Sequence, residues 1–340
     1  MIKRISYLVA ANTKPYENLA REAQLLETVA EDECILYLWQ NHRTVVIGRN
    51  QNCYKECRLE ELERDGGTLA RRLSGGGAVF HDTGNLNFTF LVQQPNYNVD
   101  RQLAVILQAM KKLGISATKS GRNDLTIAER KFSGNAFYHK GKRHYHHGTI
   151  LINADMQELA RYLQVSPAKL KAKGVDSVRS RVANLCDYNS EITVDDVTNA
   201  LIEAFGEVYD LKPQPIVEKQ LDSRRHLELV KIFSDHEWLY GKQIEFTCTY
   251  EQRFSWGDIQ LNLQIQQSKI IDAVVYSDAL DEVFITQIPA TLQNCEFLTT
   301  AMLERLQVIA DTEIKRQMVD DIGKMLVGDG AEGELIGYTI

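Results

Sequence analysis

Three consecutive glycines follow two arginines and a serine in the stretch RRLSGGGAVFHDTGNLNF, which begins at residue 71. Glycine accepts positive φ angles and lets the backbone approach a ligand, so successive N–H groups can face one anion. The planar guanidinium groups of Arg71 and Arg72 can each bind a phosphate or carboxylate through two hydrogen bonds. The stretch therefore predicts an anion site, although the glycines alone would equally suit a tight turn. The spacings of a P-loop and of a dinucleotide fingerprint are both absent.

A second polar stretch, GRNDLTIAERKFSGNAFY, begins at residue 121. Asp124 enters a predicted strand, where its carboxylate could accept from a ribose or hold Mg²⁺. Lys131 begins another strand, and regular alternation would send Lys131, Ser133 and Asn135 to one face and Phe132 to the other. If the first of these faces lines a pocket, an ammonium group has room there among small side chains. The alternative is a solvated lysine at the end of a strand.

Histidines and arginines supply the remaining candidate groups. His147 and Gly148 lie in the predicted strand HYHHGTILI, and the loop KGVDSVRSRVANL carries Arg179 and Arg181, which could close over phosphate or could form a solvated basic turn. Strand alternation would send His146 and His147 to opposite faces, and no acidic or cysteine ligand accompanies them. We therefore predict a hairpin with one histidine in the pocket, and no metal site there.

These groups need a mixed sheet to position them. Apolar residues at helical spacing predict helices over 16–31 and 100–114, and Thr193 with Asp196 predicts a capping box at the start of a helix over 192–209. CILYLW, TVVIG, NLNFTFLV and NDLTIA read as strands, and KFSGNAFY with RHYHHGTILI reads as a hairpin around the turn HKGK. Two further alternating strands precede two helical segments between about 293 and 327. We expect an α+β protein with a large domain over 1–245 and a small domain over 250–340.

Composition limits the class of protein. The chain has 340 residues, a formal net charge of −7 and six scattered cysteines. The charge argues against nonspecific nucleic-acid binding, which needs many phosphate contacts. Free, reduced thiols are expected, and no segment has the length or apolar character of a membrane span or a signal peptide. We expect a soluble, cytoplasmic protein that binds neither nucleic acid nor membranes.

Taken together and in this order, the blocks RRLSGGGAVFHDTGNLNF, GRNDL, RKFSGNA, HHGTILIN and KGVDSVRSRVANL closely resemble the lipoate-protein ligase A family. The resemblance covers nearly the whole chain, including WLYGKQIEF and RFSWG. It implies a large catalytic β-sheet of the biotin/lipoyl protein ligase type with a small α+β accessory domain. It also implies a two-step reaction, in which lipoate and ATP with Mg²⁺ give lipoyl-AMP and pyrophosphate, and the lipoyl group then passes to a lysine of a lipoyl domain. The acceptors would be the lipoyl domains of 2-oxoacid dehydrogenase complexes and the glycine-cleavage H protein.

The resemblance assigns roles to particular positions. Lys131 matches the family's lysine at the acyl and phosphoryl groups and is the predicted catalytic residue. Lipoate would contact Lys131, Arg72 and Gly77, and Mg²⁺ would bind Asp124. The residues predicted to bind ATP or lipoyl-AMP are Arg72, Ser74, Gly77, Ala78, Val79, Phe80, His81, Asn85, Asp124, Lys131, His147, Arg179 and Arg181. Independently, attack of a carboxylate on the α-phosphate brings two anions together, which a fixed cation would favour. Asn135 and Ile244 depart from the residues common in the family, and neither change removes a charge that this chemistry requires.

Two alternatives stay open from the sequence. An octanoyl- or lipoyltransferase of the same fold would need a cysteine thioester beside the pocket, for which Cys186 is a weak candidate. A noncatalytic lipoyl-domain binder would not need Arg72, Lys131 and Asp124 together. Biotin ligation is disfavoured because the glycine-rich signature differs.

Overall fold

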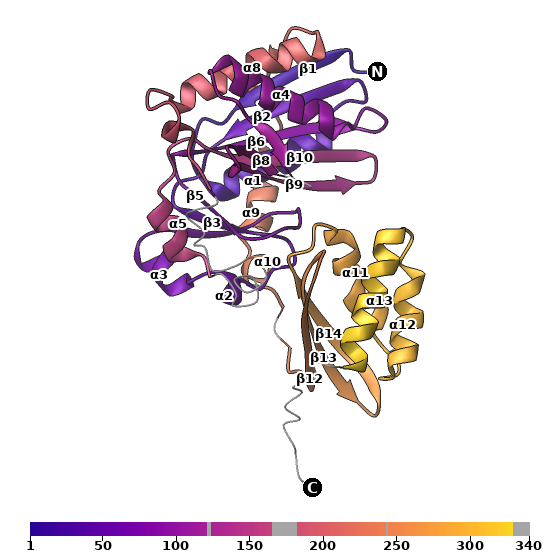
Figure 1. Cartoon of the computed structure of the whole chain (residues 1–340). Coiled ribbons are helices and arrows are strands. Elements are labelled where there is room, and N and C mark those ends of the chain that lie inside the picture. Colours follow the sequence, from indigo (N-terminus) through magenta and orange to yellow (C-terminus); the bar gives the residue numbers. More distant parts are fainter. Residues whose placement is uncertain (121–123, 165–181, 243, 329–340) are drawn as a thin grey trace. The chain divides into compact units, whose positions relative to one another are not determined.

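The computed structural model describes residues 1–120, 124–164, 182–242 and 244–328. The chain divides into two compact units (Figure 1). The first comprises residues 1–47, 54–72 and 78–239, and the second comprises 48–53, 73–77 and 240–340. The loops 48–53 and 73–77 thus group with the second unit, whereas the sequence predicts a single domain over 1–245 that includes both.

An eight-stranded mixed sheet forms the centre of the first unit. β1 pairs in parallel with β2 and β11, and the other neighbours pair antiparallel. Strands β9 and β10 form the predicted hairpin, with Gly141 at φ +61° in its turn. In spatial order the strands are β11 (Gln214–Pro215), β1 (Arg4–Val9), β2 (Glu33–Trp39), β6 (Asn85–Gln93), β10 (Arg143–Leu151), β9 (Arg130–Lys140), β8 (Asp124–Ile127) and β7 (Thr118–Ser120).

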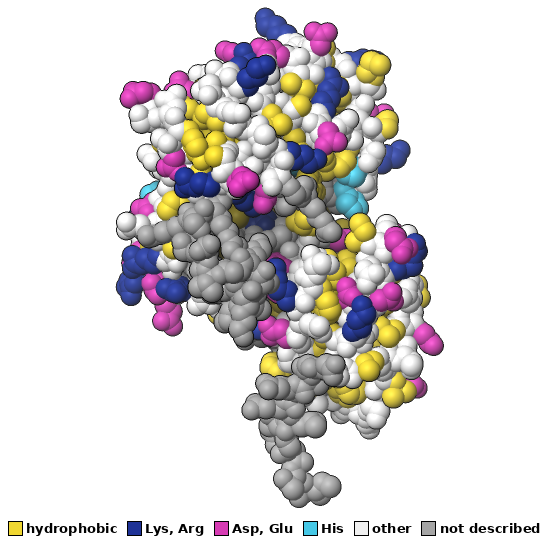
Figure 2. Space-filling view, viewed as in Figure 1, with side chains coloured by type: hydrophobic (Ala, Val, Ile, Leu, Met, Phe, Trp, Pro, Cys, Tyr) yellow, Lys and Arg dark blue, Asp and Glu magenta, His cyan; other side chains and the backbone are white. Residues whose placement is uncertain are grey.

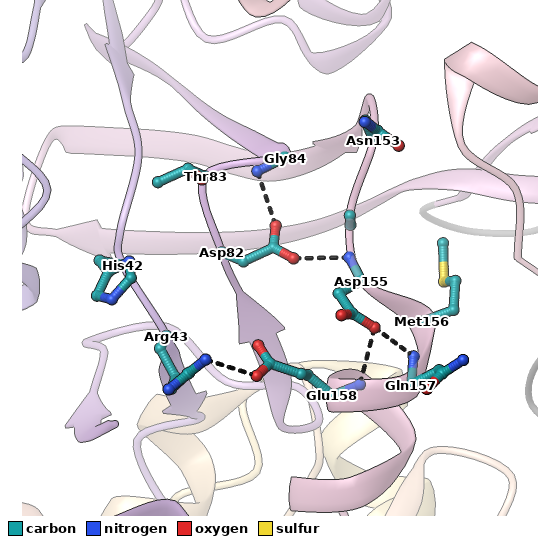
Figure 3. Close-up of a pocket in the computed structure, with 11 residues that line it drawn as sticks. His42, Arg43, Asp82, Thr83, Gly84, Asn153, Asp155, Met156, Gln157 and Glu158 are labelled. Carbon is teal, nitrogen blue, oxygen red and sulfur yellow. Dashed lines mark hydrogen bonds and ion pairs between the residues drawn. The ribbon is translucent and has the colours of Figure 1, made fainter. Parts of the chain in front are cut away.

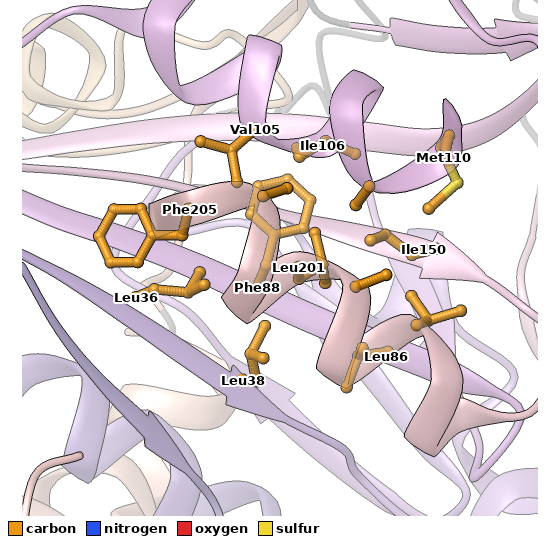
Figure 4. Packing of buried hydrophobic residues seen from close by; sticks show 14 of the residues in the cluster. Leu36, Leu38, Leu86, Phe88, Val105, Ile106, Met110, Ile150, Leu201 and Phe205 are labelled. Atoms are coloured by element: carbon orange, nitrogen blue, oxygen red, sulfur yellow. The ribbon is translucent and has the colours of Figure 1, made fainter. Parts of the chain in front are cut away.

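Helices α4 (Val99–Lys112) and α8 (Val194–Tyr209) cover one face of this sheet and enclose the apolar core (Figures 1 and 4). Asn98 accepts from the Arg101 N–H at the start of α4, and the capping box predicted for Thr193 and Asp196 is present in α8. Each cap satisfies N–H groups that have no partner inside the helix. In Figure 4 the core side chains of the strands meet those of the two helices, among them Leu36, Phe88, Ile106, Leu201 and Phe205.

Helix α1 (Pro15–Thr28) lies on the opposite face of the sheet and packs against α9 (Ser223–Phe233). This face is polar although it is buried, because Asn87 and Thr89 of β6 alternate with Phe88 and Phe90. A strand with two buried faces can bring polar groups to one of them only where hydrogen-bond partners are supplied. The α1 side of the sheet is therefore where chemistry can be placed.

A second sheet of three strands lies in the same unit, with β4 (Thr68–Arg71), β3 (Thr44–Ile47) and β5 (Val79–His81) in that order. Among the described residues, β4 is an edge strand and pairs in parallel with β3. Arg72 follows β4 directly, and His81 ends β5. The short helical elements are α2 (Cys53–Glu56), α3 (Leu59–Arg64), α5 (Met156–Tyr162), α10 (His236–Tyr240) and the 3₁₀ turns Leu185–Asp187 and Glu218–Gln220.

The second unit packs three helices on a three-stranded antiparallel sheet. The strands are β12 (Cys248–Phe254), β13 (Gly257–Gln266) and β14 (Lys269–Ser277), and the helices are α11 (Glu282–Leu292), α12 (Thr299–Val308) and α13 (Glu313–Val327). The two predicted helical segments are present, but α11 was missed. Its sequence, EVFITQIPATL, is rich in β-branched residues and contains Pro289, so local propensity disfavours a helix that burial of Phe284 and Ile288 stabilises. The α+β class and the mixed sheet are confirmed.

Surface charge is mixed in sign. On the face shown in Figure 2, lysine and arginine side chains are interspersed with aspartate and glutamate over the described residues. All six cysteines are free, as expected. Among the described residues, no helix combines the length and the apolar character that crossing a bilayer requires.

Candidate active site

A buried carboxylate stands at the centre of the polar sheet face. Glu22 of α1 is 1% exposed, and its Oε1 accepts from the Thr89 hydroxyl at 2.7 Å and lies 2.8 Å from Nδ1 of His147. Trp39 donates its indole N–H to the Thr89 hydroxyl at 3.0 Å. Tyr37, Thr89, His147 and Ala136 form one cross-strand row over β2, β6, β10 and β9. Four strands and a helix therefore converge on this carboxylate.

His81 joins this group from the small sheet. It is 3% exposed, and its Nδ1 lies 3.2 Å from the Asn41 amide nitrogen. Burial lowers the pKa of His81 to about 3, and the charges of Arg72 and His147 contribute to the shift. The ring is therefore neutral near pH 7, and Nδ1 accepts from Asn41, so Nε2 carries the proton. Among the described residues this buried Nε2–H has no hydrogen-bond partner, which leaves one donor for a ligand oxygen.

Arg72 supplies a buried positive charge beside His81. Its side chain is 6% exposed, and Nη1 donates to the Val46 carbonyl at 3.1 Å. Burial lowers the pKa of Arg72 to about 10, and interaction with Tyr145 and Glu22 opposes that shift. The guanidinium group is therefore charged at neutral pH. Its charge acts on His81, Tyr145 and Glu22, so these groups lie within electrostatic range of it.

Arg71 does not share this role. Its guanidinium group donates to the carbonyls of Trp238 and Leu239 at the end of the first unit, at 2.6 and 2.7 Å. Successive residues of an extended chain point in opposite directions, so two adjacent arginines cannot hold one anion from the same strand end. The expectation that both arginines serve the anion site is wrong for Arg71.

Lys131 reaches the polar face because β9 contains a bulge. Leu125 of β8 pairs with Ser133, but Thr126 pairs with Lys131, so Phe132 is an extra residue in β9. Phe132 and Ser133 are both buried, and Phe132 belongs to the core beneath α4 and α8. A bulge of this kind reverses the alternation of the strand on one side of it.

The bulge overturns the predicted facing of this strand. The side-chain oxygen Oδ1 of Asn135 lies 2.8 Å from Nε2 of His146, and Nδ1 of the same ring lies 3.0 Å from Oε1 of Gln102 in α4, so Asn135 points to the core side. A Cβ on Gly134 would lie 2.9 Å from Nζ of Lys131, so Lys131 shares the side of Gly134 and Ala136. Lys131 therefore faces the same side as His147, whereas Asn135 and Ser133 do not. The predicted separation of His146 and His147 is confirmed.

Asp124 holds the ammonium group of Lys131. Nζ and Oδ1 are 2.6 Å apart, and the two side chains are 40% and 36% exposed. Asp124 pairs directly with Gly134, whose missing side chain leaves the space over which the lysine lies. The pair is half-exposed, so solvent screens it and an incoming anion can compete for the lysine.

The glycine run belongs to the second unit and has a partly structural explanation. A Cβ on Gly75 would lie 2.3 Å from the Ala279 carbonyl oxygen, and Gly76 has φ +88° and donates to that carbonyl at 3.2 Å. A Cβ on Gly77 would meet no atom within 4 Å. Ser74 is buried in the same loop. Close backbone packing therefore requires Gly75 and Gly76, whereas at Gly77 no described atom would meet a Cβ.

Other predicted residues have different surroundings. Phe80 packs its ring against Tyr162, with centroids 5.4 Å apart, while Ala78 and Val79 are half-buried. Asn85 is buried and donates to Asn87 at 3.0 Å. Arg179 and Arg181 lie outside the described residues.

A separate polar hollow of about 600 Å³ lies where β5 ends (Figure 3). Both carboxylate oxygens of Asp82 accept backbone N–H groups, from Gly84 and Asp155. Asp155 in turn caps α5, and Glu158 pairs with Arg43 at 2.8 Å. These acidic groups fix turns and a helix end, so the hollow carries no assigned chemistry.

Comparison with known proteins decides the family. The lipoyl protein ligase A/B catalytic domain matches residues 14–206, and the bacterial lipoate protein ligase C-terminus matches residues 243–326. A lipoate-protein ligase A from Psychrobacter cryohalolentis is 41% identical over 96% of this chain and 99% of its own length. The chain belongs to the lipoate-protein ligase A family. The predicted resemblance and the lipoate-protein ligase function that it implied are confirmed.

Solved structures of lipoate-protein ligases have the same architecture. The crystal structure of P. falciparum LipL1 in complex with lipoate gives a TM-score of 0.82 at 30% identity, over 94% of this chain and 98% of that one. A lipoate-protein ligase A bound with ATP gives a TM-score of 0.60 at 28% identity, over 71% of this chain and 99% of that one.

Cys186, the candidate for a thioester route, lies in surroundings that do not activate a thiol. The Cys186 thiol donates to the Ile192 carbonyl at 3.3 Å, and burial raises its pKa. A nucleophilic cysteine needs the opposite environment, one that stabilises its thiolate. The surroundings of Cys186 therefore favour a thiol that stays protonated in this member of the lipoate-protein ligase A family.

Sequence reasoning missed Glu22, Asn41, Trp39 and Thr89, which complete the polar face. One signal was available for Glu22, because it lies on the predicted apolar face of its helix with Leu19 and Leu26. A second lay in NLNFTFLV, where Asn87 and Thr89 alternate with phenylalanines in a strand that is buried on both faces. Both patterns indicate polar groups that must find partners inside the protein.

Proposed function

We propose that this lipoate-protein ligase is ATP-dependent, that it joins the lipoate carboxylate to AMP with release of pyrophosphate, and that it transfers the lipoyl group to a lysine of a lipoyl domain. The observation that carries the proposal is the placement of Lys131, which the bulge at Phe132 turns to the sheet face of His147 and which Asp124 holds at 2.6 Å. An ammonium group so fixed needs little reorganisation when an anion arrives, and such preorganised charge is effective in catalysis.

In the first step, a carboxylate oxygen of lipoate attacks the α-phosphorus of ATP, and the bond from that phosphorus to the pyrophosphate oxygen breaks. Both reactants are anionic, so a cation that contacts them lowers their repulsion and stabilises the charge that spreads over the phosphoryl oxygens. Lys131 supplies this charge. Arg72 supplies a second positive charge, and the Nε2–H of His81 supplies a neutral donor.

In the second step, the amine of the acceptor lysine attacks the carbonyl carbon of lipoyl-AMP, the amine loses its proton, and AMP leaves with the electron pair of the broken C–O bond. Lys131 remains beside the carbonyl oxygen and withdraws electron density from the mixed anhydride. The same cation therefore serves both steps.

Mg²⁺ fits Asp124 on chemical grounds. Magnesium in nucleotide enzymes binds through one or two carboxylates together with substrate phosphates and water. Oδ1 of Asp124 is paired with Lys131, so the second oxygen would be the ligand, and the ion would neutralise phosphate charge. No group of three or more potential ligands of the His, Cys, Asp and Glu types gathers among the described residues, so ATP would have to complete the coordination.

The remaining residue roles and the domain division complete the proposal. Ser74, Gly77, Ala78, Val79, Phe80, Asn85, His147, Arg179 and Arg181 bind ATP or lipoyl-AMP, with Gly77 and Arg72 also contacting lipoate. Residues 1–245 form the catalytic domain and 250–340 the accessory domain, and the acceptors are lipoyl domains of 2-oxoacid dehydrogenase complexes and the H protein. The matches over 14–206 and 243–326 support this division.

Lipoate-dependent exchange of labelled pyrophosphate into ATP tests the proposal. The purified protein with Mg²⁺ should catalyse exchange only when lipoate is present, and an added lipoyl domain should gain one lipoyl mass. Lys131→Ala should retain its thermal transition and lose exchange by on the order of 100-fold or more. Lipoyl transfer from an acyl-carrier thioester in the absence of ATP, without any exchange, would refute ATP dependence.

A further inference from the structure

A reciprocal set of hydrogen bonds joins the end of β4 to α10. The Arg71 guanidinium group donates through Nε to the Trp238 carbonyl at 2.6 Å and through Nη2 to the Leu239 carbonyl at 2.7 Å. In the other direction, the Trp238 indole N–H donates to the Arg71 carbonyl at 3.0 Å. Arg71 is 4% exposed, and Trp238 packs edge-on against Phe233 of α9, with centroids 5.9 Å apart. We call these four residues, Arg71, Phe233, Trp238 and Leu239, the strand-end clamp.

The clamp acts on the side of β4 along which no described strand pairs. β4 pairs with β3 on one side only, and the Arg72 N–H on that side donates to the Ile47 carbonyl at 3.1 Å. Peptide groups alternate along a strand, so the Arg71 carbonyl points away from β3, and the Trp238 indole satisfies it there. The last carbonyls of a helix have no donor within the helix, and the Arg71 guanidinium group donates to two of them in α10, those of Trp238 and Leu239. Trp238 therefore supplies a donor to a carbonyl of the edge strand, and Arg71 supplies donors to carbonyls at the end of the helix.

Arg72 is the residue that this arrangement positions. It follows Arg71 directly, its Nη1 donates to the Val46 carbonyl of β3 at 3.1 Å, and its buried charge acts on His81. A four-residue edge strand held by one neighbour would leave its end free to shift, and the Arg72 guanidinium would shift with it. We propose that Arg71 and Trp238 are positioning residues, which hold the end of β4 so that the Arg72 guanidinium stays beside His81 and meets the anionic substrate. The link to substrate rests on the proposed function, whereas the link to His81 does not.

Trp238→Phe tests the inference because it retains a ring against Phe233 and deletes the donor to the Arg71 carbonyl. Arg71→Lys is the second variant, since it keeps the positive charge but cannot donate through two guanidinium nitrogens to the Trp238 and Leu239 carbonyls at once. The matched control is Trp256→Phe in the second unit, which deletes an indole N–H that donates to Asp321 at 3.1 Å. Two readouts are used, the ring signals of ¹³C-labelled histidine in NMR spectra and the kinetics of lipoate-dependent pyrophosphate exchange.

The His81 ring signal senses the Arg72 charge, so it should move in both clamp variants. In the Trp256→Phe control it should stay at the wild-type position. They should raise the KM for ATP about tenfold with kcat changed by less than about threefold, because a misplaced binding group costs affinity. An unmoved His81 signal with wild-type KM in both folded variants would overturn the inference. If both variants unfold at the assay temperature, the clamp is a folding element and the inference is likewise overturned. A shifted His81 signal in variants of a protein that shows no exchange at all would instead refute the proposed function.

Discussion

Replacing Gly134 by alanine tests the placement of Lys131 with a single methyl group. The added Cβ would lie 2.9 Å from both Cε and Nζ of Lys131. Non-bonded heavy atoms prefer separations of about 3.5–4.0 Å, so the end of the lysine must move by roughly 0.6–1 Å. The lysine is 40% exposed and flexible, so it can move without disturbing the sheet. Gly134 also lacks the positive φ that would strain an alanine.

We therefore expect stability and activity to change in different directions. Alanine in a strand is favoured over glycine by roughly 0.5–1 kcal/mol, so the melting temperature should stay the same or rise slightly. A displacement of about 1 Å in a catalytic group can cost on the order of 100-fold in rate. Gly134→Ala should accordingly lose on the order of 10- to 100-fold in lipoate-dependent pyrophosphate exchange, which corresponds to about 1.4–2.7 kcal/mol.

A double-mutant cycle isolates the cause. In a Lys131→Ala background the methyl group has no lysine to displace, so Gly134→Ala should have no further effect on the residual rate. Melting curves of all four proteins serve as the folding control. Wild-type exchange by Gly134→Ala, or an equal loss in both backgrounds, would refute the claim that Lys131 acts from its position over Gly134.

Three further predictions concern titrating groups. Burial lowers the pKa of both His81 and His146 to about 3. Between pH 3 and 6.5 the unfolded chain therefore binds up to two more protons than the folded chain. As the pH falls through this range, these two groups should lower the free energy of unfolding by up to about 3 kcal/mol per pH unit. Urea titrations at pH 4.5, 5.5 and 6.5 measure this slope, and His146→Gln should remove about half of it; an unchanged slope would contradict the assignment. Burial raises the pKa of Glu282, which is 4% exposed, to about 7, so the folded state loses stability as pH rises from about 4.5 through 7. Glu282→Gln should therefore raise the unfolding free energy at pH 8 by on the order of 1–3 kcal/mol and have little effect at pH 4.5, and calorimetric melting at both pH values checks the sign. Cys186→Ser should retain wild-type exchange and transfer rates, and a loss of lipoyl transfer would reopen the thioester route.

Local patterns in the sequence were enough to predict several elements. Helices α1 and α4 lie within a few residues of their predicted ranges, and the capping box of α8 follows from the spacing of Thr193 and Asp196. The β9–β10 hairpin and the opposite orientations of His146 and His147 follow from turn chemistry and strand alternation. These features depend on neighbours a few residues away, so the chain itself encodes them.

The site needed contacts between distant residues. Glu22 meets His147 across 125 positions, and only the packing of α1 on the sheet brings them to 2.8 Å. Arg71 and Arg72 have the same chemistry in sequence, but α10 packs beside Arg71 and leaves Arg72 to the polar face.

The sequence by itself determined which charges the protein carries and the elements that hold them, including Lys131 at the start of its strand. The tertiary structure decided which way Lys131 points. Strict alternation would place Phe132 and Ser133 on opposite faces of the strand. Instead β9 admits Phe132 as one extra residue, and the core beneath α4 and α8 buries its ring. Burying a phenylalanine ring is worth about 1.5–3 kcal/mol, and that gain depends on helices far along the chain. The bulge that buries Phe132 also turns Lys131 to the face where His147 lies.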